Sequence, residues 1–303
     1  MGRRSDVGRP RALLTGRNGF TGRYVARELE AAGYEVIGLS DGQDLSHMGA
    51  ITANLLDRVA VHAAVAAVHP DVVLHLAAIS FVAHGDVDEI YRVNVLGTRN
   101  LLDALASAPK SPRMVVLASS ANVYGNTDVE PITEATPLAP ENDYAVSKCA
   151  MEYMARLWMN KLPIVITRPF NYTGVGQSEQ FLIPKIVAHF RRGERIIELG
   201  NTQVVRDFGD VRDVAATYAG LVRSMPVNGV FNICTGVGHS LGGVLDMMCE
   251  IAGYRMEVRV NPQFVRANEV ARLVGSNAGI HHVLGAVTTR SLRETLAWMY
   301  AGD

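Results

Sequence analysis

The sequence predicts an α/β fold of the Rossmann type, in which a doubly wound parallel sheet is accompanied by a smaller α+β region. Through residue 168, short apolar runs alternate with longer amphipathic ones, and several of the short runs are apolar without interruption. Strands buried on both faces have this pattern. Regular β-α alternation in turn gives a parallel sheet with helices on both sides.

The expected elements follow from these runs in chain order. Strands are expected at 12–14, 35–39, 72–76, 114–117 and 164–167, and helices at about 21–32, 57–69, 90–107 and 143–160. After Arg168 the alternation stops, and a stretch punctuated by proline and glycine leads to a helix near 180–192. The rest of the chain is less regular, which favours a smaller second region over a repeat of the first.

Composition restricts the class of protein. The chain has 303 residues, is 48% hydrophobic and 19% charged, and carries a net charge of −1, so we expect a folded protein without a nucleic-acid surface. Three cysteines without a CxxC pair favour a reducing, cytoplasmic location. No apolar run approaches the roughly 20 residues that span a bilayer, so no membrane segment is expected. The histidines lack metal-ligand spacing, so we expect no metal site.

A glycine-rich loop follows the first expected strand. It reads TGRNGFTG at 15–22 and leads into a helix, with Gly16, Gly19 and Gly22 in a G-x-x-G-x-x-G spacing. Glycine permits close backbone approach, and a helix N-terminus offers free N–H groups to a pyrophosphate. A glycine-rich loop alone is weak evidence, but its place in a β-α-β unit predicts a dinucleotide-binding loop.

The second strand ends in GLSDGQD, where Asp41 is positioned to bind the ribose. A carboxylate there accepts hydrogen bonds from the ribose hydroxyls of NAD and repels the 2′-phosphate of NADP. The alternative is a loop aspartate in a turn beside Gly42. We expect NAD(P)H as cofactor, with NADH favoured.

Three residues form a candidate catalytic set. Tyr144 and Lys148 are four apart in ENDYAVSK and therefore share one helix face, while Ser120 stands at the end of the fourth strand. An ammonium near a phenol is expected to lower the pKa of that phenol, which then exchanges a proton near neutral pH. A Y-x-x-x-K pair alone is common on solvated helices. Together with the glycine loop and Ser120, it predicts an oxidoreductase site.

The motifs TGRNGFTG, LHLAA, VNVLGT, SSANVYG and YAVSK together resemble the extended short-chain dehydrogenase/reductases that act on nucleotide sugars. The resemblance covers almost the whole chain and implies catalytic roles for Ser120, Tyr144 and Lys148. It also implies cofactor contacts from Tyr144 and Lys148, with Lys148 on the nicotinamide ribose. Further implied cofactor contacts come from Asn18, Phe20, Asn54, Leu55, Leu76, Ala77 and Ala78.

The second half of the chain resembles the sugar-nucleotide segments of the same family. By this resemblance the substrate-binding residues are Ser80, Asn171, Lys185, Arg206 and Arg266. A guanidinium suits a diphosphate because its planar fork matches phosphate oxygens. The implied domains are a dinucleotide-binding domain at 1–168, with a return segment at about 205–235, and a sugar-nucleotide domain at 169–204 and 236–303.

The two residues after Ser120 separate the subfamilies. Relatives that dehydrate sugars carry acidic residues there, whereas this chain has Ala121 and Asn122. Neither can act as that acid or base, which argues against dehydration. The second-half segments most resemble reductases that act on GDP-4-keto-6-deoxy-mannose, so a GDP-linked 6-deoxy-4-keto sugar is the expected substrate and GDP-D-rhamnose the favoured product.

Two other functions remain open on sequence. A nucleotide-sugar 4-epimerase uses the same three residues with tightly bound NAD, and a catalytically silent NAD-binding regulator would need only the cofactor site. The helical patterns at about 90–107 and 143–160 are apolar nearly all round. Such helices are covered either by the core or by a second copy, and we expect a homodimer through them.

Overall fold

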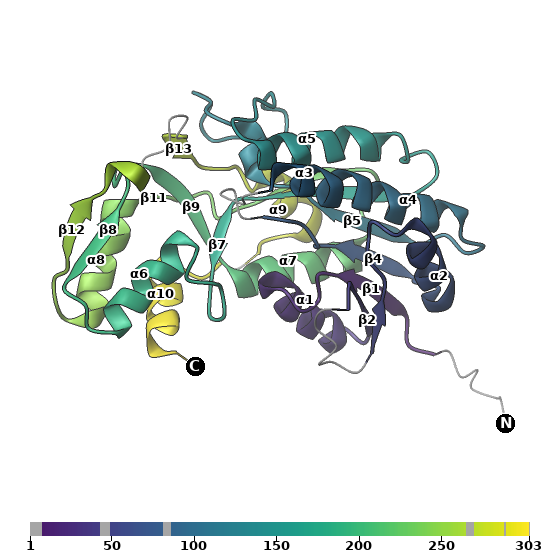
Figure 1. The fold of residues 1–303 in the computed structure, drawn as a ribbon, viewed down its shortest axis with the longest axis horizontal. Coiled ribbons are helices and arrows are strands. Elements are labelled where there is room, and N and C mark those ends of the chain that lie inside the picture. Colours follow the sequence, from purple (N-terminus) through teal and green to yellow (C-terminus); the bar gives the residue numbers. More distant parts are fainter. Residues whose placement is uncertain (1–7, 43–48, 81–85, 265–269, 288, 303) are drawn as a thin grey trace. The chain divides into compact units, whose positions relative to one another are not determined.

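A seven-stranded sheet is built mainly from the first half of the chain (Figure 1). The computed structural model describes residues 8–42, 49–80, 86–264, 270–287 and 289–302. Its strands, in the order β10-β6-β5-β4-β1-β2-β3, are β1 (Arg11–Thr15), β2 (Glu35–Ser40), β3 (Ala50–Thr52), β4 (Val72–His75), β5 (Met114–Ala118), β6 (Ile164–Pro169) and β10 (Val230–Ile233). The registered pairs among β1 to β5 are parallel. The expected fold class and all five expected strands are confirmed, while β3 and β10 were not predicted.

The chain divides into two compact units, which are described separately. The first comprises Met1–Ala118, Ala150–Ile166 and Tyr218–Gly229, and the second Ser119–Cys149, Thr167–Thr217 and Val230–Asp303. The predicted domain boundaries assign the dinucleotide and the sugar nucleotide to different parts of the chain. A division by compactness does not test which ligand each part binds, so these boundaries stay a prediction.

The first unit shows why its strands are apolar without interruption. Residues 12–14 of β1 and 72–74 of β4 are completely buried, as expected for strands covered on both faces. Its helices include α1 (Phe20–Ala31), α2 (Arg58–Val68), α3 (Val87–Tyr91) and α4 (Thr98–Ser107). The single helix expected at 90–107 is interrupted by a π-helical segment, η1 (Arg92–Gly97). No described helix is long and apolar enough to span a membrane.

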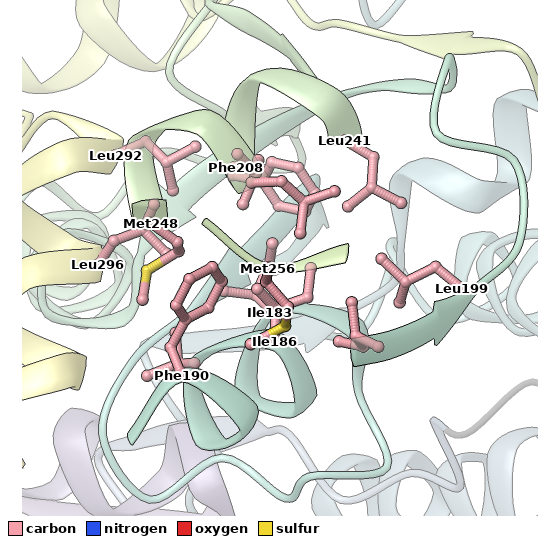
Figure 2. Close-up of a cluster of buried hydrophobic side chains, with 14 of the residues drawn as sticks. Ile183, Ile186, Phe190, Leu199, Phe208, Leu241, Met248, Met256, Leu292 and Leu296 are labelled. Carbon is pink, nitrogen blue, oxygen red and sulfur yellow. The ribbon is translucent and has the colours of Figure 1, made fainter. Parts of the chain in front are cut away.

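The second unit is organised around β9 (Val205–Asp210), which pairs with β11 (Gly238–Ser240), β13 (Arg272–Leu273) and β7 (Asn171–Thr173). The other elements beyond β5 are η2 (Ala121–Tyr124), α5 (Asp143–Arg156), α6 (Leu182–Arg191), β8 (Ile196–Leu199), α7 (Val211–Ser224), α8 (Leu241–Ala252), β12 (Glu257–Val260), η3 (Pro262–Phe264), α9 (Ala278–Leu284) and α10 (Leu292–Ala301). Phe190, Met248 and Leu296, from α6, α8 and α10, meet in one buried core (Figure 2).

A buried polar network lies inside the second unit. The Arg168 guanidinium donates from Nη1 to the Tyr124 hydroxyl (3.0 Å) and to the Glu134 carbonyl (3.2 Å). The Tyr124 hydroxyl donates to Asn232 Oδ1 (2.7 Å), and the Asn232 backbone N–H donates to Glu134 Oε1 (2.8 Å). Because a buried charge needs partners, this network fixes the segment around Glu134.

The segment that joins η2 to α5 is also held by the C-terminal part of the chain. Ile132 donates its N–H to the Val274 carbonyl (2.9 Å) and accepts from the Ser276 N–H (2.8 Å). The Asn232 side chain donates to the Ile132 carbonyl (3.0 Å). The connection between η2 and α5 is therefore anchored to residues at least 100 positions later in the chain.

Candidate active site

The glycine loop of the first unit has no room for a side chain at Gly16 or Gly22. Gly16 has φ +72°, and a Cβ there would lie 2.9 Å from the Ala77 nitrogen. A Cβ on Gly22 would lie 2.0 Å from the Gly16 carbonyl oxygen. Helix α1 begins at Phe20, and its N-cap Gly19 supplies no capping side chain. This backbone fits a dinucleotide pyrophosphate, which would approach the start of the helix.

Arg17, inside the glycine loop, is a residue that our sequence reasoning missed. Its Nη2 pairs with Glu30 (3.0 Å), and its aliphatic stem packs on Gly38 of β2, where a Cβ would lie 2.9 Å from Arg17 Cδ. Its Nη1 is one of two buried side-chain polar atoms without a hydrogen-bond partner among the described residues. An unpaired buried donor is costly, and a polar cofactor group would satisfy it. The only sequence signal was an arginine between the glycines.

The other predicted cofactor residues occupy loops of the first unit. Asp41 is exposed and directly follows β2. The Asn54 side chain accepts the Leu56 N–H (2.8 Å), and the Leu55 carbonyl accepts from Asn100 Nδ2 (2.9 Å). Leu76, Ala77 and Ala78 directly follow β4, and Asn18 and Phe20 belong to the glycine loop and the start of α1. These residues form the loops after β1, β2, β3 and β4, where ligands bind in open parallel sheets.

The second unit brings the three candidate catalytic residues together. Ser120 precedes η2, and Tyr144 and Lys148 lie on α5, whose start is capped by Asn142 Oδ1 accepting from the Ala145 N–H (2.9 Å). The Tyr144 and Ser120 side chains are hydrogen-bonded. Lys148 Nζ lies 5.9 Å from the Tyr144 ring centroid. All three catalytic candidates are largely buried.

The pKa of Tyr144 differs from our expectation. Burial raises it to about 12, the hydrogen bond with Ser120 acts to lower it, and Tyr172 raises it further. The expected lowering of the Tyr144 pKa below its ordinary value is therefore not found in the protein alone, because desolvation of the phenolate dominates. At neutral pH Tyr144 is a protonated phenol, and thus a proton donor.

Ser119 holds the second buried polar atom without a partner. Its side chain is 3% exposed and its Oγ has no hydrogen-bond partner in the described structure, while its N–H donates to the Thr167 carbonyl (2.7 Å). Ser119 directly precedes Ser120, so an unsatisfied hydroxyl stands beside the candidate catalytic one. Such groups in native proteins are frequently satisfied by a ligand or water.

Two of the predicted substrate-binding residues lie on paired strands of the second unit. Asn171 opens β7 opposite Phe208 of β9, and Arg206 lies two residues earlier on β9. Arg206 Nη1 donates to the carbonyl of Val205 (2.9 Å), its neighbour in the chain.

Lys185 lies on α6, elsewhere in the second unit. Its Nζ donates to the Glu198 carbonyl (3.1 Å) and lies 4.7 Å from the Phe264 ring centroid. Ser80, in the first unit, is exposed. Arg266 lies outside the described residues. The substrate-binding roles of all these residues stay predictions.

One further polar residue near Arg206 was also missed. His239 of β11 stands directly opposite Arg206 in the antiparallel β9–β11 pair, and residues so paired present side chains to the same face. Burial lowers the pKa of His239, and nearby Asp207 partly offsets this.

Sequence comparison decides the family. The profile of the NAD dependent epimerase/dehydratase family matches residues 12–234. This chain belongs to that family. The family accounts for the glycine loop, and it makes the protein a nucleotide-sugar enzyme of the short-chain dehydrogenase/reductase type with an NAD or NADP cofactor.

Two curated relatives align over nearly the full length. The GDP-6-deoxy-D-talose 4-dehydrogenase of Aggregatibacter actinomycetemcomitans is 33% identical over 95% of this chain and 96% of its own. The GDP-6-deoxy-D-mannose reductase of Pseudomonas aeruginosa is 30% identical over 94% of each.

Two solved structures show the same fold. A protein from Burkholderia cenocepacia J2315 is 48% identical, with a TM-score of 0.91 over 97% of this chain and 98% of its own. RMD from Pseudomonas aeruginosa, complexed with NADPH, is 28% identical with a TM-score of 0.82 over 97% of each chain.

Proposed function

We propose that the protein reduces the C4 ketone of GDP-4-keto-6-deoxy-D-mannose with NAD(P)H to give a GDP-6-deoxyhexose. The observation that carries this proposal is that two near-full-length relatives are both named as oxidoreductases of GDP-6-deoxyhexoses. The presence of Ala121 and Asn122, where dehydrating relatives carry acids, supports reduction over dehydration.

In the proposed reaction Tyr144 donates its phenolic proton to the oxygen at C4. The raised pKa of Tyr144 supports this direction, since reduction requires the residue to hold a proton when the substrate arrives. The Ser120 hydroxyl donates to the same oxygen, and the Lys148 ammonium stabilises the phenolate that remains. When bound, the reduced nicotinamide supplies the hydride.

The test uses purified enzyme and GDP-4-keto-6-deoxy-mannose made by a separate dehydratase. We expect one reduced nicotinamide to be oxidised per sugar, with loss of the nicotinamide absorbance and formation of a GDP-6-deoxyhexose. Nuclear magnetic resonance of the product then gives the C4 configuration, for which we expect D-rhamnose, with 6-deoxy-D-talose as the other outcome. GDP-mannose with NAD should give no 4-keto product.

A nucleotide-sugar 4-epimerase is the second candidate, favoured by the name of the matching family. An epimerase would interconvert two C4 hydroxyl configurations without net consumption of nicotinamide, and NAD would remain bound through purification. Either result in place of stoichiometric oxidation would reject the reductase.

We also propose that the protein forms a homodimer through helices of the first unit. The exposed apolar side chains in the two predicted interface segments include Leu96 of η1 (51%), Tyr153 of α5 (57%) and Leu157 just beyond α5 (76%). Exposed apolar side chains of this size favour an interface. Light scattering should give twice the chain mass, and Leu157→Asp should shift the protein to the monomer. A monomeric wild type would reject this proposal.

A further inference from the structure

A buried histidine that the proposed reaction does not use stands at the end of β4. His75 is registered with Thr15, the last residue of the neighbouring β1, and both side chains are buried. His75 Nδ1 lies 2.7 Å from Thr15 Oγ1, and His75 Nε2 lies 2.8 Å from Thr98 Oγ1. The imidazole therefore connects the first strand of the sheet to helix α4.

The hydrogen bonds around the ring determine where its proton lies. Thr98 Oγ1 donates to the Asn94 carbonyl (2.7 Å), so it presents a lone pair to His75 and must accept from Nε2–H. In the neutral ring Nδ1 is then an acceptor, which receives the Thr15 hydroxyl proton. The Thr15 oxygen in turn accepts the Ala77 backbone N–H (3.1 Å). We call this series of hydrogen bonds, from Thr98 through His75 and Thr15 to Ala77, the relay. Each of its protons has one acceptor.

The relay ends on the loop that follows β4. Thr15 holds the N–H of Ala77, while Asn94 Oδ1 accepts the Ile79 N–H (2.9 Å) and Asn94 Nδ2 donates to the Ile79 carbonyl (3.2 Å). The same loop lies against the glycine loop, because a Cβ on Gly16 would reach the Ala77 nitrogen at 2.9 Å. The loop after β4 is thus held by side chains at Ala77 and at Ile79, and it packs against the glycine loop.

The helical side of the relay has an unusual backbone. Asn94 lies in the π-helical segment η1, and Thr98 is the first residue of α4. Such turns are rare and frequently occur at functional sites. Asn94, inside this turn, bonds the loop after β4, and Thr98, directly after the turn, bonds His75 at the end of β4.

We propose that His75 is a positioning residue for the cofactor. In its neutral, Nε2-protonated form it closes a relay from Thr98 through Thr15 to Ala77, and so fixes the loop of residues 76–79 in the shape that binds the dinucleotide. The inference rests on the proposed function, in which this loop and the glycine loop bind the dinucleotide. It adds a function for the LHLAA and VNVLGT motifs, which contact each other through His75 and Thr98.

The test is titration of NADPH and NADH by nicotinamide fluorescence, with thermal melting measured in parallel. Thr15→Val keeps the shape of the side chain but removes the hydroxyl that Ala77 and His75 share. We expect cofactor affinity to fall about 10-fold, equivalent to about 1.4 kcal/mol, with KM for the cofactor raised more than kcat falls. Thr15→Ser, which keeps the hydroxyl, should restore most of the affinity.

A matched control separates positioning from stability. Thr217→Val removes another buried threonine hydroxyl, which donates to the Asp213 carbonyl (2.8 Å), and should lower the melting temperature without changing cofactor affinity. If Thr15→Val does not fold, Thr98→Val removes the acceptor of His75 Nε2–H and takes its place. Wild-type affinity in a folded Thr15→Val or Thr98→Val variant would overturn the inference. Failure of the wild type to bind either nucleotide would instead reject the proposed function.

Discussion

Two buried tyrosines in the second unit offer a direct test of the catalytic assignment. Tyr144 and Tyr124 both have a pKa raised to about 12, mainly by burial. Tyr124 contacts Arg168 and Asn232, whereas Tyr144 contacts Ser120 beside Lys148. Substitution of each by phenylalanine removes one buried hydroxyl, but we expect opposite consequences.

For Tyr144→Phe we expect a large loss of activity and a small loss of stability. Loss of a general acid typically lowers the rate by about 10²–10⁴-fold, which corresponds to about 2.7–5.4 kcal/mol of transition-state stabilisation. The hydrogen bond with Ser120 is between neutral groups and contributes about 0.5–1.5 kcal/mol to folding. Cofactor affinity should be unchanged because the glycine loop is untouched.

For Tyr124→Phe we expect the reverse. The hydroxyl is shared between a buried guanidinium and a buried amide, and its loss leaves both without that partner. A hydrogen bond to a charged group contributes about 1.5–3 kcal/mol, so the free energy of unfolding should fall by about that amount. The kcat should stay near the wild-type value.

The assay combines urea unfolding with steady-state oxidation of reduced nicotinamide on the 4-keto sugar. A Tyr144→Phe enzyme that retains more than about half of the wild-type kcat, against the 10²-fold minimum expected for a lost acid, would remove Tyr144 from the mechanism. Equal losses of kcat in the two variants would show that burial of a hydroxyl, and not proton donation, determines activity.

Three further predictions concern binding and pH. Arg206→Ala should weaken nucleotide-sugar binding by about 1.5–3 kcal/mol and leave cofactor binding unchanged; calorimetry showing equal sugar affinity would contradict the diphosphate role. Asp41→Ala should raise kcat/KM for NADPH relative to NADH, because the carboxylate repels a 2′-phosphate of about −1.5 to −2 charges; an unchanged ratio would show that the carboxylate does not contact the ribose. The folded chain keeps the Tyr124 proton to about pH 12 while the unfolded chain releases it near 10.0, so the stability due to this group is complete below pH 10 and lost as pH rises to 12. Tyr124→Phe should therefore unfold with a smaller alkaline pH dependence than the wild type.

Local patterns predicted much of this structure because the features that they encode are local. Short apolar runs, several of them unbroken, indicated the five strands, since strands covered on both faces need apolar residues. The glycine loop and the Tyr144–Lys148 spacing were recognisable because each lies within one turn or one helix.

Features that depend on distant residues could not be predicted in this way. The relay through His75 joins residues 15, 75 and 98, and the contacts of Arg168 join residues 124 and 134. The pKa of Tyr144 was misjudged for a related reason, because the spacing to Lys148 was visible whereas the burial of the phenol was not. The π-helical segment η1 has no signature in the hydrophobic pattern, which is compatible with a continuous α-helix.

The anchoring of the segment between η2 and α5 has a consequence for protein synthesis. Ser120 and Tyr144 leave the ribosome early, but the connection between them is held by Asn232 and by the strand pairing of Ile132 with residues 274–276. Translation adds about 5–20 residues per second, so the partners of this connection emerge many seconds after Tyr144. A nascent chain therefore carries Tyr144, the proposed proton donor, well before it carries the residues that anchor the connection between Tyr144 and Ser120. On the proposed mechanism, the site can be completed only when the chain is nearly finished.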